Sequence, residues 1–249
     1  MSLRTRAMHR RLLVVCVLVS FATGLCVASF AGFREFLPGL LAGAWVTLQI
    51  TVAGGALAVV MGLIAGLCKL YGVRPLRWLA VTYIEVFRGT SALVQLFWLF
   101  FVLPRFGVSL SPMAVAIIAL GLNVGAYGAE VVRASILAVP HGQFEAAIAL
   151  NMSRLTMLRR IILPQALVRM IPPWGNLFIE LLKASALVSL ITISDLTFKA
   201  YQMNQTTFRT VEIFSLVLVL YLGIALMITM SMRMLEARAS TGLARGRTE

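Results

Sequence analysis

Charged side chains are scarce in this sequence, and their scarcity excludes a soluble globular domain. Asp, Glu, Lys and Arg make up only 12% of the 249 residues, whereas hydrophobic residues make up 60% and the mean hydropathy is +0.94. Soluble domains carry about 25% charged residues. We therefore interpret the chain as an integral membrane protein.

Residues that bind metals or act as nucleophiles are also few. Cys16, Cys26 and Cys68 lie in or beside apolar segments and lack the spacing of metal ligands, so we interpret them as small packing residues. His9 and His141 are far apart and have no neighbouring ligands, which disfavours a metal site. An intramembrane enzyme is disfavoured as well, because no expected span contains His.

Long hydrophobic runs are what the sequence offers instead. A membrane-spanning helix needs about 20 apolar residues. Six stretches are long enough, at approximately 12–32, 39–68, 78–103, 112–133, 172–196 and 212–235. They predict an all-α polytopic membrane protein of about six helices, folded as one bundle.

The net charge of +13 reflects where Lys and Arg stand along the chain. Most of them lie in segments that share one side of the expected spans, at 4–11, 69–77, 133–169 and 233–247. The other side has only Arg34, Arg105, Lys199 and Arg209. By the positive-inside rule, both termini and the segment after the fourth span are expected in the cytoplasm, and no nucleic-acid partner is needed to explain the charge.

Polar side chains form a stripe along the fourth expected span. Asn123, Tyr127 and Glu130 stand at i, i+4 and i+7, and glycines at 121, 125 and 128 occupy the opposite stripe. Small residues let helices approach closely in lipid, so we expect the glycine stripe to pack against another helix. The polar stripe would then face the bundle interior or a wet pathway.

The fifth expected span, which Pro172-Pro173 would open, repeats this spacing with Asn176, Glu180 and Lys183. Charged residues within a span cost several kcal/mol unless they are paired or hydrated. Glu180 and Lys183 can neutralise each other at i, i+3, or they can line a transport route, and both alternatives stay open.

Two further charged sites stand near span ends. Glu85 and Arg88 are three residues apart and can pair on one helix face near the cytoplasmic end of the third span. We interpret them as a structural pair, with a gate contact as the alternative. Asp195, the only aspartate in the chain, is expected near the outer end of the fifth span.

The segment 143–164 is a polar, basic island between apolar runs, and it still carries helical spacing. Glu145 is expected in a first helical turn, where the helix dipole favours an acid. Asn151 tolerates the left-handed conformation and can end this helix, and Ser153 can cap a second helix that runs to Pro164. The segment therefore predicts a helix, a corner and a second helix.

This segment closely resembles the EAA loop of bacterial ATP-binding-cassette importer permeases. Glu145-Ala146-Ala147 and Ile161-Ile162-Leu163-Pro164 match the motif, and Asn151 stands where the family has Gly. Four more stretches resemble the amino-acid-importer branch, with Ser91 replacing a Pro whose loss is expected to alter a kink. These stretches are 43–49, 85–95, 123–133 and 176–189.

The resemblance implies a type I importer permease fold, in which an extra N-terminal span precedes a five-helix core. Residues 1–38 would form a cytoplasmic tail and the extra helix. Residues 39–236 would form the permease domain, with a cytoplasmic coupling loop at 139–171. Residues 237–249 would be a short, basic and disordered cytoplasmic tail.

The resemblance also implies partners in the bacterial inner membrane: two cytoplasmic ATPase subunits, a second permease subunit and an external solute-binding protein. The chain has no Gly-x-x-x-x-Gly-Lys-Ser/Thr phosphate loop, so it is not expected to be an enzyme or to hold a cofactor. ATP and Mg would be bound by the ATPase partners. The residues expected to dock on an ATPase are Glu145, Ala146, Ala147, Leu150, Asn151 and Arg154.

These features together predict the permease subunit of an importer for polar amino acids or related zwitterions. A zwitterion at membrane depth needs both charges compensated, so Glu130 or Glu180 is expected to meet its ammonium group and Arg88 or Lys183 its carboxylate. The alternative is a gradient-driven secondary transporter or channel, although we find no convincing inverted repeat. The expected pathway residues are Asn123, Tyr127, Glu130, Asn176, Glu180, Lys183 and Arg88.

Overall fold

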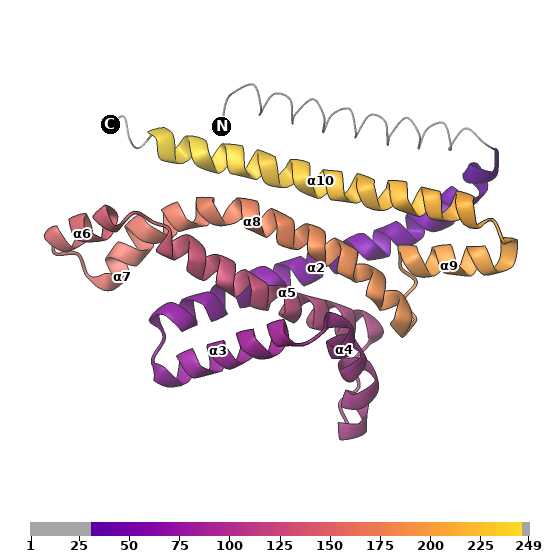
Figure 1. Cartoon of the computed structure of the whole chain (residues 1–249), viewed down its shortest axis with the longest axis horizontal. Coiled ribbons are helices and arrows are strands. Elements are labelled where there is room, and N and C mark those ends of the chain that lie inside the picture. The colour runs from indigo at the N-terminus through magenta and orange to yellow at the C-terminus, as the bar shows by residue number, and fades with distance from the viewer. Residues whose placement is uncertain (1–30, 246–249) are drawn as a thin grey trace.

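The computed structural model describes residues 31–245, which form helices joined by short connections (Figure 1). The span expected at 12–32 lies outside the described residues except for its last two, and so do Cys16, Cys26 and His9. Between residues 31 and 245 no strand is formed. The predicted all-α fold is confirmed.

Four long helices make up most of the bundle: α2 (Ala31–Tyr71), α5 (Pro112–Leu137), α8 (Leu163–Ala184) and α10 (Thr210–Arg245). The shorter helices are α3 (Arg74–Gly89), α4 (Ala92–Phe97), α6 (His141–Ala149), α7 (Arg154–Met157) and α9 (Leu196–Thr207). Two π-helical turns, η1 (Trp98–Val102) and η3 (Leu158–Ile162), and two 3-10 helices, η2 (Leu103–Phe106) and η4 (Ser185–Ile191), extend them.

Four helical stretches in the described part of the chain can cross a membrane, or five if a sharply bent pair is counted as one span. Four continuous helical stretches are long and apolar enough, at 34–71, 112–137, 154–191 and 210–240. The bent pair formed by 74–89 and 92–106 makes a fifth. This number agrees with the expected five-helix core.

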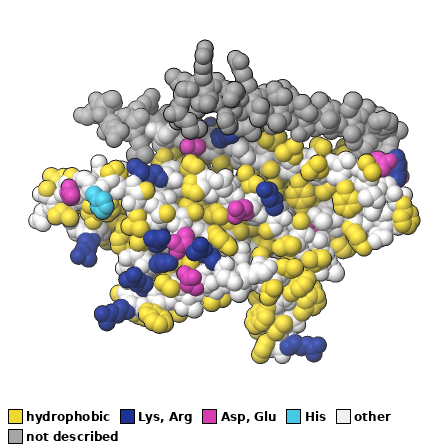
Figure 2. All heavy atoms as spheres, viewed as in Figure 1, with side chains coloured by type: hydrophobic (Ala, Val, Ile, Leu, Met, Phe, Trp, Pro, Cys, Tyr) yellow, Lys and Arg dark blue, Asp and Glu magenta, His cyan; other side chains and the backbone are white. Residues whose placement is uncertain are grey.

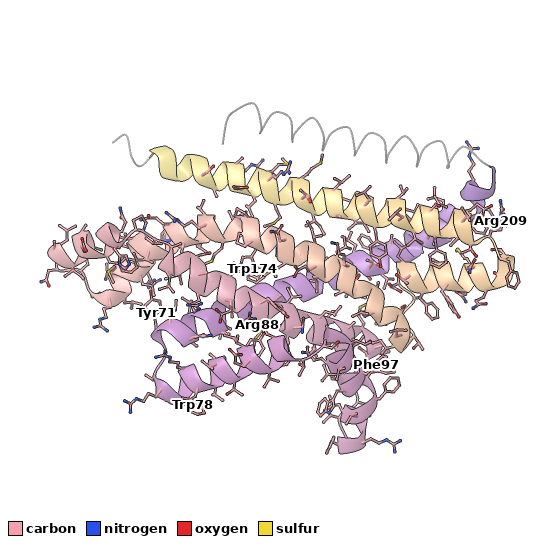
Figure 3. All side chains as sticks on the ribbon, in the orientation of Figure 1. Tyr71, Trp78, Arg88, Phe97, Trp174 and Arg209 are labelled. Atoms are coloured by element: carbon pink, nitrogen blue, oxygen red, sulfur yellow. The ribbon has the colours of Figure 1, made fainter. Side chains whose placement is uncertain are left out.

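The centre of the bundle is the crossing of α2 and α5, where glycines let the two backbones meet. A Cβ atom at Gly121 would lie 3.0 Å from the carbonyl oxygen of Gly54. A Cβ atom at Gly66 would lie 2.8 Å from the carbonyl oxygen of Ala129. The ring of Trp174 on α8 closes the crossing and is only 6% exposed (Figure 3). The predicted packing of the α5 glycine stripe against another helix is therefore confirmed.

The prediction that residues 78–103 form one continuous helix is wrong, because the chain bends by 105° between α3 and α4. Thr90 and Ser91, which separate the two helices, have extended backbones. The side-chain amide of Gln95 donates to the carbonyl oxygen of Phe87 at 3.0 Å and to Thr90 Oγ1 at 2.6 Å. A side chain of α4 thus holds the bend beside Ser91, where the resemblance led to the expectation of an altered kink.

Three other expected boundaries fall inside helices. Pro38 lies within α2, so no helix begins or ends at the expected division after residue 38, and the division itself stays a prediction. Pro172 and Pro173 lie inside α8 and do not open it, because the packed helix continues through them despite the hydrogen bonds that prolines remove. The tail from residue 237, predicted as disordered, is helical as far as Arg245.

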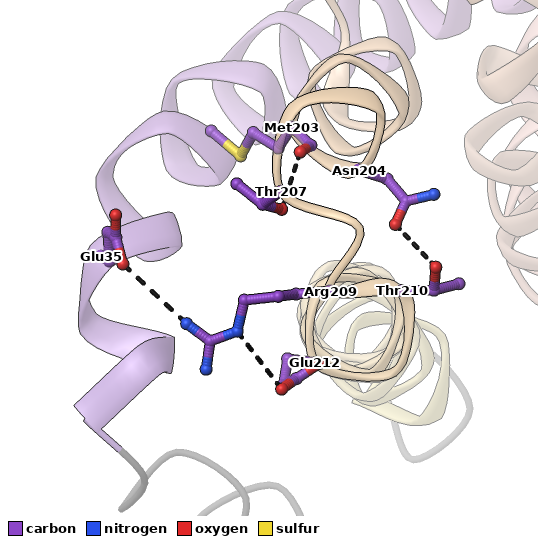
Figure 4. A network of polar contacts seen from close by, with 7 residues as sticks. All are labelled: Glu35, Met203, Asn204, Thr207, Arg209, Thr210 and Glu212. Carbon is purple, nitrogen blue, oxygen red and sulfur yellow. Dashed lines mark hydrogen bonds and ion pairs between the residues drawn. The ribbon is translucent and has the colours of Figure 1, made fainter.

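The two ends of the bundle differ. α6 and α7 extend at one end of the long axis, and α9, a helix that the sequence did not predict, lies near the other (Figure 1). Charged side chains gather toward the α6 end and around α3, while hydrophobic side chains dominate the middle (Figure 2). At the α9 end, Arg209 contacts Glu212 at 3.4 Å and Glu35 at 4.0 Å, which joins the start of α10 to the start of α2 (Figure 4).

Candidate functional site

Residues 141–162, here called the EAA-like segment, fold as α6, a corner, α7 and η3. Asn151 is in the left-handed conformation, with φ 53°. The N–H of Met152 donates to the carbonyl of Ala147 at 3.0 Å, and the N–H of Asn151 donates to that of Ile148 at 2.9 Å. These are the two hydrogen bonds of a Schellman helix end. The predicted corner at Asn151 is confirmed.

Ser153 begins the second helix of the segment. Its Oγ accepts a hydrogen bond from the N–H of Thr156 at 3.2 Å, as the cap prediction requires. The prediction that this helix ends at Pro164 is wrong, because η3 shifts the hydrogen-bond register before Pro164 and the chain continues into α8. The placement of Glu145 in a first turn is also wrong, since α6 begins at His141.

Side chains of α8 attach the EAA-like segment to the spans. Gln165 Nε2 donates to Gln143 Oε1 at 3.2 Å and so joins α8 to α6. Arg169 Nη1 donates to the carbonyl oxygen of Ala138 at 2.6 Å and so joins α8 to the end of α5. Ala147 is fully buried. It therefore packs α6 onto the rest of the chain, although the sequence predicted it among the docking residues.

The outer side of the EAA-like segment exposes apolar side chains. Ile148, Leu150 and Leu155 are 68%, 73% and 64% exposed. Large exposed apolar patches mark sites of contact with another protein, a membrane or a ligand. The remaining residues predicted to dock are exposed beside it: Glu145, Ala146, Asn151 and Arg154.

Asn123, in the polar stripe of α5, holds α3 and α4 in place. Its Nδ2 donates to the carbonyl oxygen of Phe87 at 2.9 Å and to Gln95 Oε1 at 3.2 Å. The hydroxyl of Tyr83 on α3 adds a hydrogen bond of 2.7 Å to the carbonyl oxygen of Leu122. Asn123 thus supports the bent pair and uses the N–H donors of its amide to do so.

Arg88 lies against α5 and not against Glu85. Its guanidinium stands over the ring of Tyr127, 5.3 Å from the ring centroid, and Figure 3 places it between α3 and α5. The Tyr127 hydroxyl reaches the carbonyl oxygen of Arg88 at 3.5 Å. No ion pair joins Glu85 to Arg88 in the described range, so the predicted pair is wrong. The cation–π contact with Tyr127 takes its place.

Glu130 is balanced by two cations. Its Oε1 lies 2.6 Å from Lys69 Nζ and its Oε2 lies 2.8 Å from Arg133 Nε. Lys69 cannot be recognised as a partner from the sequence, because it stands 61 residues earlier, near the end of α2. The cluster joins α2 to α5 and satisfies the carboxylate that was expected to meet a solute.

The second polar stripe lies on the surface of α8. Asn176, Glu180 and Lys183 are all exposed. No ion pair is formed between Glu180 and Lys183 in the part of the chain that the structure describes, so the mutual neutralisation is not formed. Exposed pairs gain little from holding one geometry. A spanning helix with two unpaired charges on its surface requires water or another protein there.

Comparison with known proteins gives consistent matches. The family described as "Binding-protein-dependent transport system inner membrane component" matches residues 58–241. A probable amino-acid ABC transporter permease of Sinorhizobium fredii is 44% identical, covering 82% of this chain and 89% of the relative. The glutamine transport system permease protein GlnP of Escherichia coli is 38% identical, covering 81% and 93%.

Solved structures agree with these matches. A chain from the crystal structure of an amino acid ABC transporter with histidines is 36% identical, with a TM-score of 0.78 over 84% of this chain and 98% of that one. A chain of the MetNI methionine ABC transporter in an inward-facing conformation has a TM-score of 0.69 at 22% identity, and it supports the fold alone.

Proposed function

This chain belongs to the family of binding-protein-dependent transport system inner membrane components, and we propose that it carries polar amino acids or related zwitterions as the permease subunit of an ATP-binding-cassette importer. The observation that carries the proposal is the EAA-like segment, which is exposed at one end of the bundle and bonded to α8, and α8 is in turn bonded to the end of α5. A chain without a phosphate loop needs an external energy source and a surface that receives it.

A cytoplasmic ATPase subunit is the partner that fits this surface. Ile148, Leu150 and Leu155 would enter an apolar groove, and Glu145 and Arg154 would form polar contacts at its rim. Two ATPase subunits would bind ATP and Mg, while the permease contributes no catalytic group. Both termini of the chain would lie on this cytoplasmic side of the inner membrane.

Movement of the ATPase would reach the spans through short, stiff links. α6 is fixed by the buried Ala147 and by the hydrogen bond between Gln143 and Gln165, and α8 is fixed to α5 by Arg169. A displacement of α6 therefore shifts the cytoplasmic ends of α5 and α8 together. Such a shift is the kind of rigid-body change that moves an opening from one membrane face to the other.

A second permease subunit, identical or homologous, would cover the polar stripe of α8. Asn176, Glu180 and Lys183 are exposed on a spanning helix, and lipid is a costly neighbour for their charges. The interface would also enclose the solute pathway. Because Glu130 already has two cations and Arg88 already has Tyr127, Glu180 and Lys183 are the better candidates to meet the ammonium and carboxylate groups of a zwitterion. An external binding protein would deliver the solute at the α9 end.

The test of ATPase docking is Glu145→Arg. The variant is expected to insert into the membrane normally and to lose the ATPase during purification in mild detergent, because it reverses a charge at the rim of the docking surface. Glu236→Arg is the matched control, since Glu236 is an exposed carboxylate on the part of α10 expected on the same side. Retention of the ATPase by Glu145→Arg would contradict the docking role.

The importer and the gradient-driven carrier differ in their energy source. In proteoliposomes that contain the full complex, uptake should follow ATP supply and survive ionophores that collapse ion gradients. Uptake that follows an ion gradient and ignores ATP would replace the importer with the carrier.

A further inference from the structure

Asp195 is a buried carboxyl group that has no role in the proposed ATPase docking or in the proposed solute pathway. It follows η4 and caps α9, where its Oδ1 accepts a hydrogen bond from the N–H of Phe198 at 2.9 Å. The residue is 0% exposed, and its second oxygen, Oδ2, has no hydrogen-bond partner. A buried carboxylate oxygen without a donor is costly when charged, and protonation removes that cost.

The surroundings of Asp195 are polar, uncharged and closely packed. Thr47 of α2, also fully buried, accepts a hydrogen bond from the N–H of Leu196 at 3.2 Å. Tyr221 of α10 is 3.0 Å from Thr197 Oγ1. A Cβ atom at Gly43 would lie 2.8 Å from the carbonyl oxygen of Asp195, so α2 passes directly against the start of α9. The site can accept a proton without needing additional space.

No cation is paired with Asp195 in the described residues, where the four ion pairs involve other carboxylates. Tyr221 is the titratable group of α10 beside it, and η4 carries none. Burial raises the pKa of the Asp195 carboxyl to about 6, and hydrogen bonds from Phe198 and Thr197 offset this only in part. On α9 the other titratable groups are Lys199 and Tyr201, and Arg209 stands between α9 and α10. On α2 and α10 they lie along the helices away from Thr47 and Tyr221: Arg34, Glu35, Cys68, Lys69 and Tyr71 on α2, and Glu212, Arg233, Glu236 and Arg238 on α10.

We propose that Asp195 is a proton-binding site that holds its proton on Oδ2 while α9 is packed against α2 and α10, and that loses it when α9 separates from them. The site lies at the end of the bundle opposite the EAA-like segment (Figure 1). It is separate from the polar stripes of α5 and α8, and it does not depend on which solute is carried.

The sign of the pH effect follows from the two states. The packed carboxyl has the raised pKa of about 6 and the separated one has its ordinary value, near 3.8. The packed state therefore binds more protons between these values, and acid favours packing. As the pH rises from about 4 to 7, the ratio of separated to packed α9 should increase by up to about 100-fold, since each pKa unit is a factor of ten.

The chain allows a direct measurement because Asp195 is its only aspartate. Cell-free synthesis of the full chain with side-chain carboxyl ¹³C-labelled aspartate, followed by insertion into nanodiscs, gives a single labelled carboxyl resonance. We expect its chemical shift to titrate with a midpoint of about 6. A midpoint near 4 would show an ordinary, hydrated carboxylate and would overturn the proposal.

A variant measurement tests the link to packing. Asp195→Asn keeps an oxygen that caps α9 and replaces the carboxyl with a neutral group, so its thermal stability should lose the decrease between pH 4.5 and 7.5 that Asp195 causes. The unmodified chain should lose stability over that interval, and Glu212→Gln, which removes a half-buried carboxylate on α10, should behave like it. Equal pH dependence of Asp195→Asn and the unmodified chain would overturn the proposal, even if uptake and ATPase docking were as expected.

Discussion

The corner at Asn151 offers the sharpest test of how the EAA-like segment works. Its φ of 53° is a conformation that Asn tolerates and that Gly adopts without strain, whereas a β-branched side chain is poorly suited to it. Replacing Asn151 with Val should therefore cost about 1–2 kcal/mol at this residue. Asn151→Gly, which restores the residue found in the family motif, should cost little.

The cost should appear in ATPase binding, because the corner sets the direction of α6 relative to α7. An energy of about 1–2 kcal/mol corresponds to roughly a 5- to 30-fold change in dissociation constant, if the strain is relieved only when α6 leaves its docked position. Titration of the purified ATPase onto nanodisc-embedded permease, followed by biolayer interferometry, measures this change. The expected order is Asn151→Gly equal to the unmodified chain, with Asn151→Val weaker.

Two controls separate the corner from general effects. Leu137→Val introduces the same β-branched side chain at an exposed position at the end of α5, where the backbone is helical, and it should leave ATPase binding unchanged. Thermal unfolding of each variant confirms that the bundle is intact. Unchanged binding by Asn151→Val, or equal weakening by Asn151→Gly, would refute the argument that the left-handed corner positions α6.

Two further predictions concern the bundle and the pathway. Gly66→Ala should lower the unfolding temperature, because its Cβ would meet the Ala129 carbonyl oxygen at 2.8 Å and such overpacking costs about 1–3 kcal/mol. Gly223→Ala is the control and should not lower it, because a Cβ atom there would have nothing within 4 Å. Equal stability of the two variants would show that α2 and α5 are less closely packed. Lys183→Met should raise the KM for uptake about tenfold or more and leave ATPase binding unchanged, because it removes a charge proposed to meet the solute carboxylate; an unchanged KM would remove Lys183 from the pathway.

Features that depend on neighbouring residues in the sequence could be predicted correctly. Asn151 and Ser153 were assigned to the corner and the cap from backbone preferences alone, and both assignments are confirmed because they depend on neighbours within a few residues. The spacing of the α5 glycines also predicts their packing, because in lipid small residues on one helix face let a second helix approach closely.

The errors arose where distant contacts outweigh local rules. Pro172 and Pro173 suggested a helix start, but the packed α8 continues through them. The sequence does not identify Lys69 as the partner of Glu130, because the two residues are 61 positions apart. Local spacing favours Glu85 as the partner of Arg88, because Tyr127 becomes its neighbour only when α3 packs against α5. The bend after α3 depends on hydrogen bonds from Gln95, which only the folded chain brings into reach.

The exposed apolar side chains of Ile148, Leu150 and Leu155 also bear on how much of each subunit a cell makes. A permease synthesised in excess of its ATPase would present this surface to water, where it can bind chaperones, other unassembled copies or proteases. Unassembled chains would then be removed faster than assembled ones. The abundance of the permease would follow that of its ATPase without any control at the level of the gene.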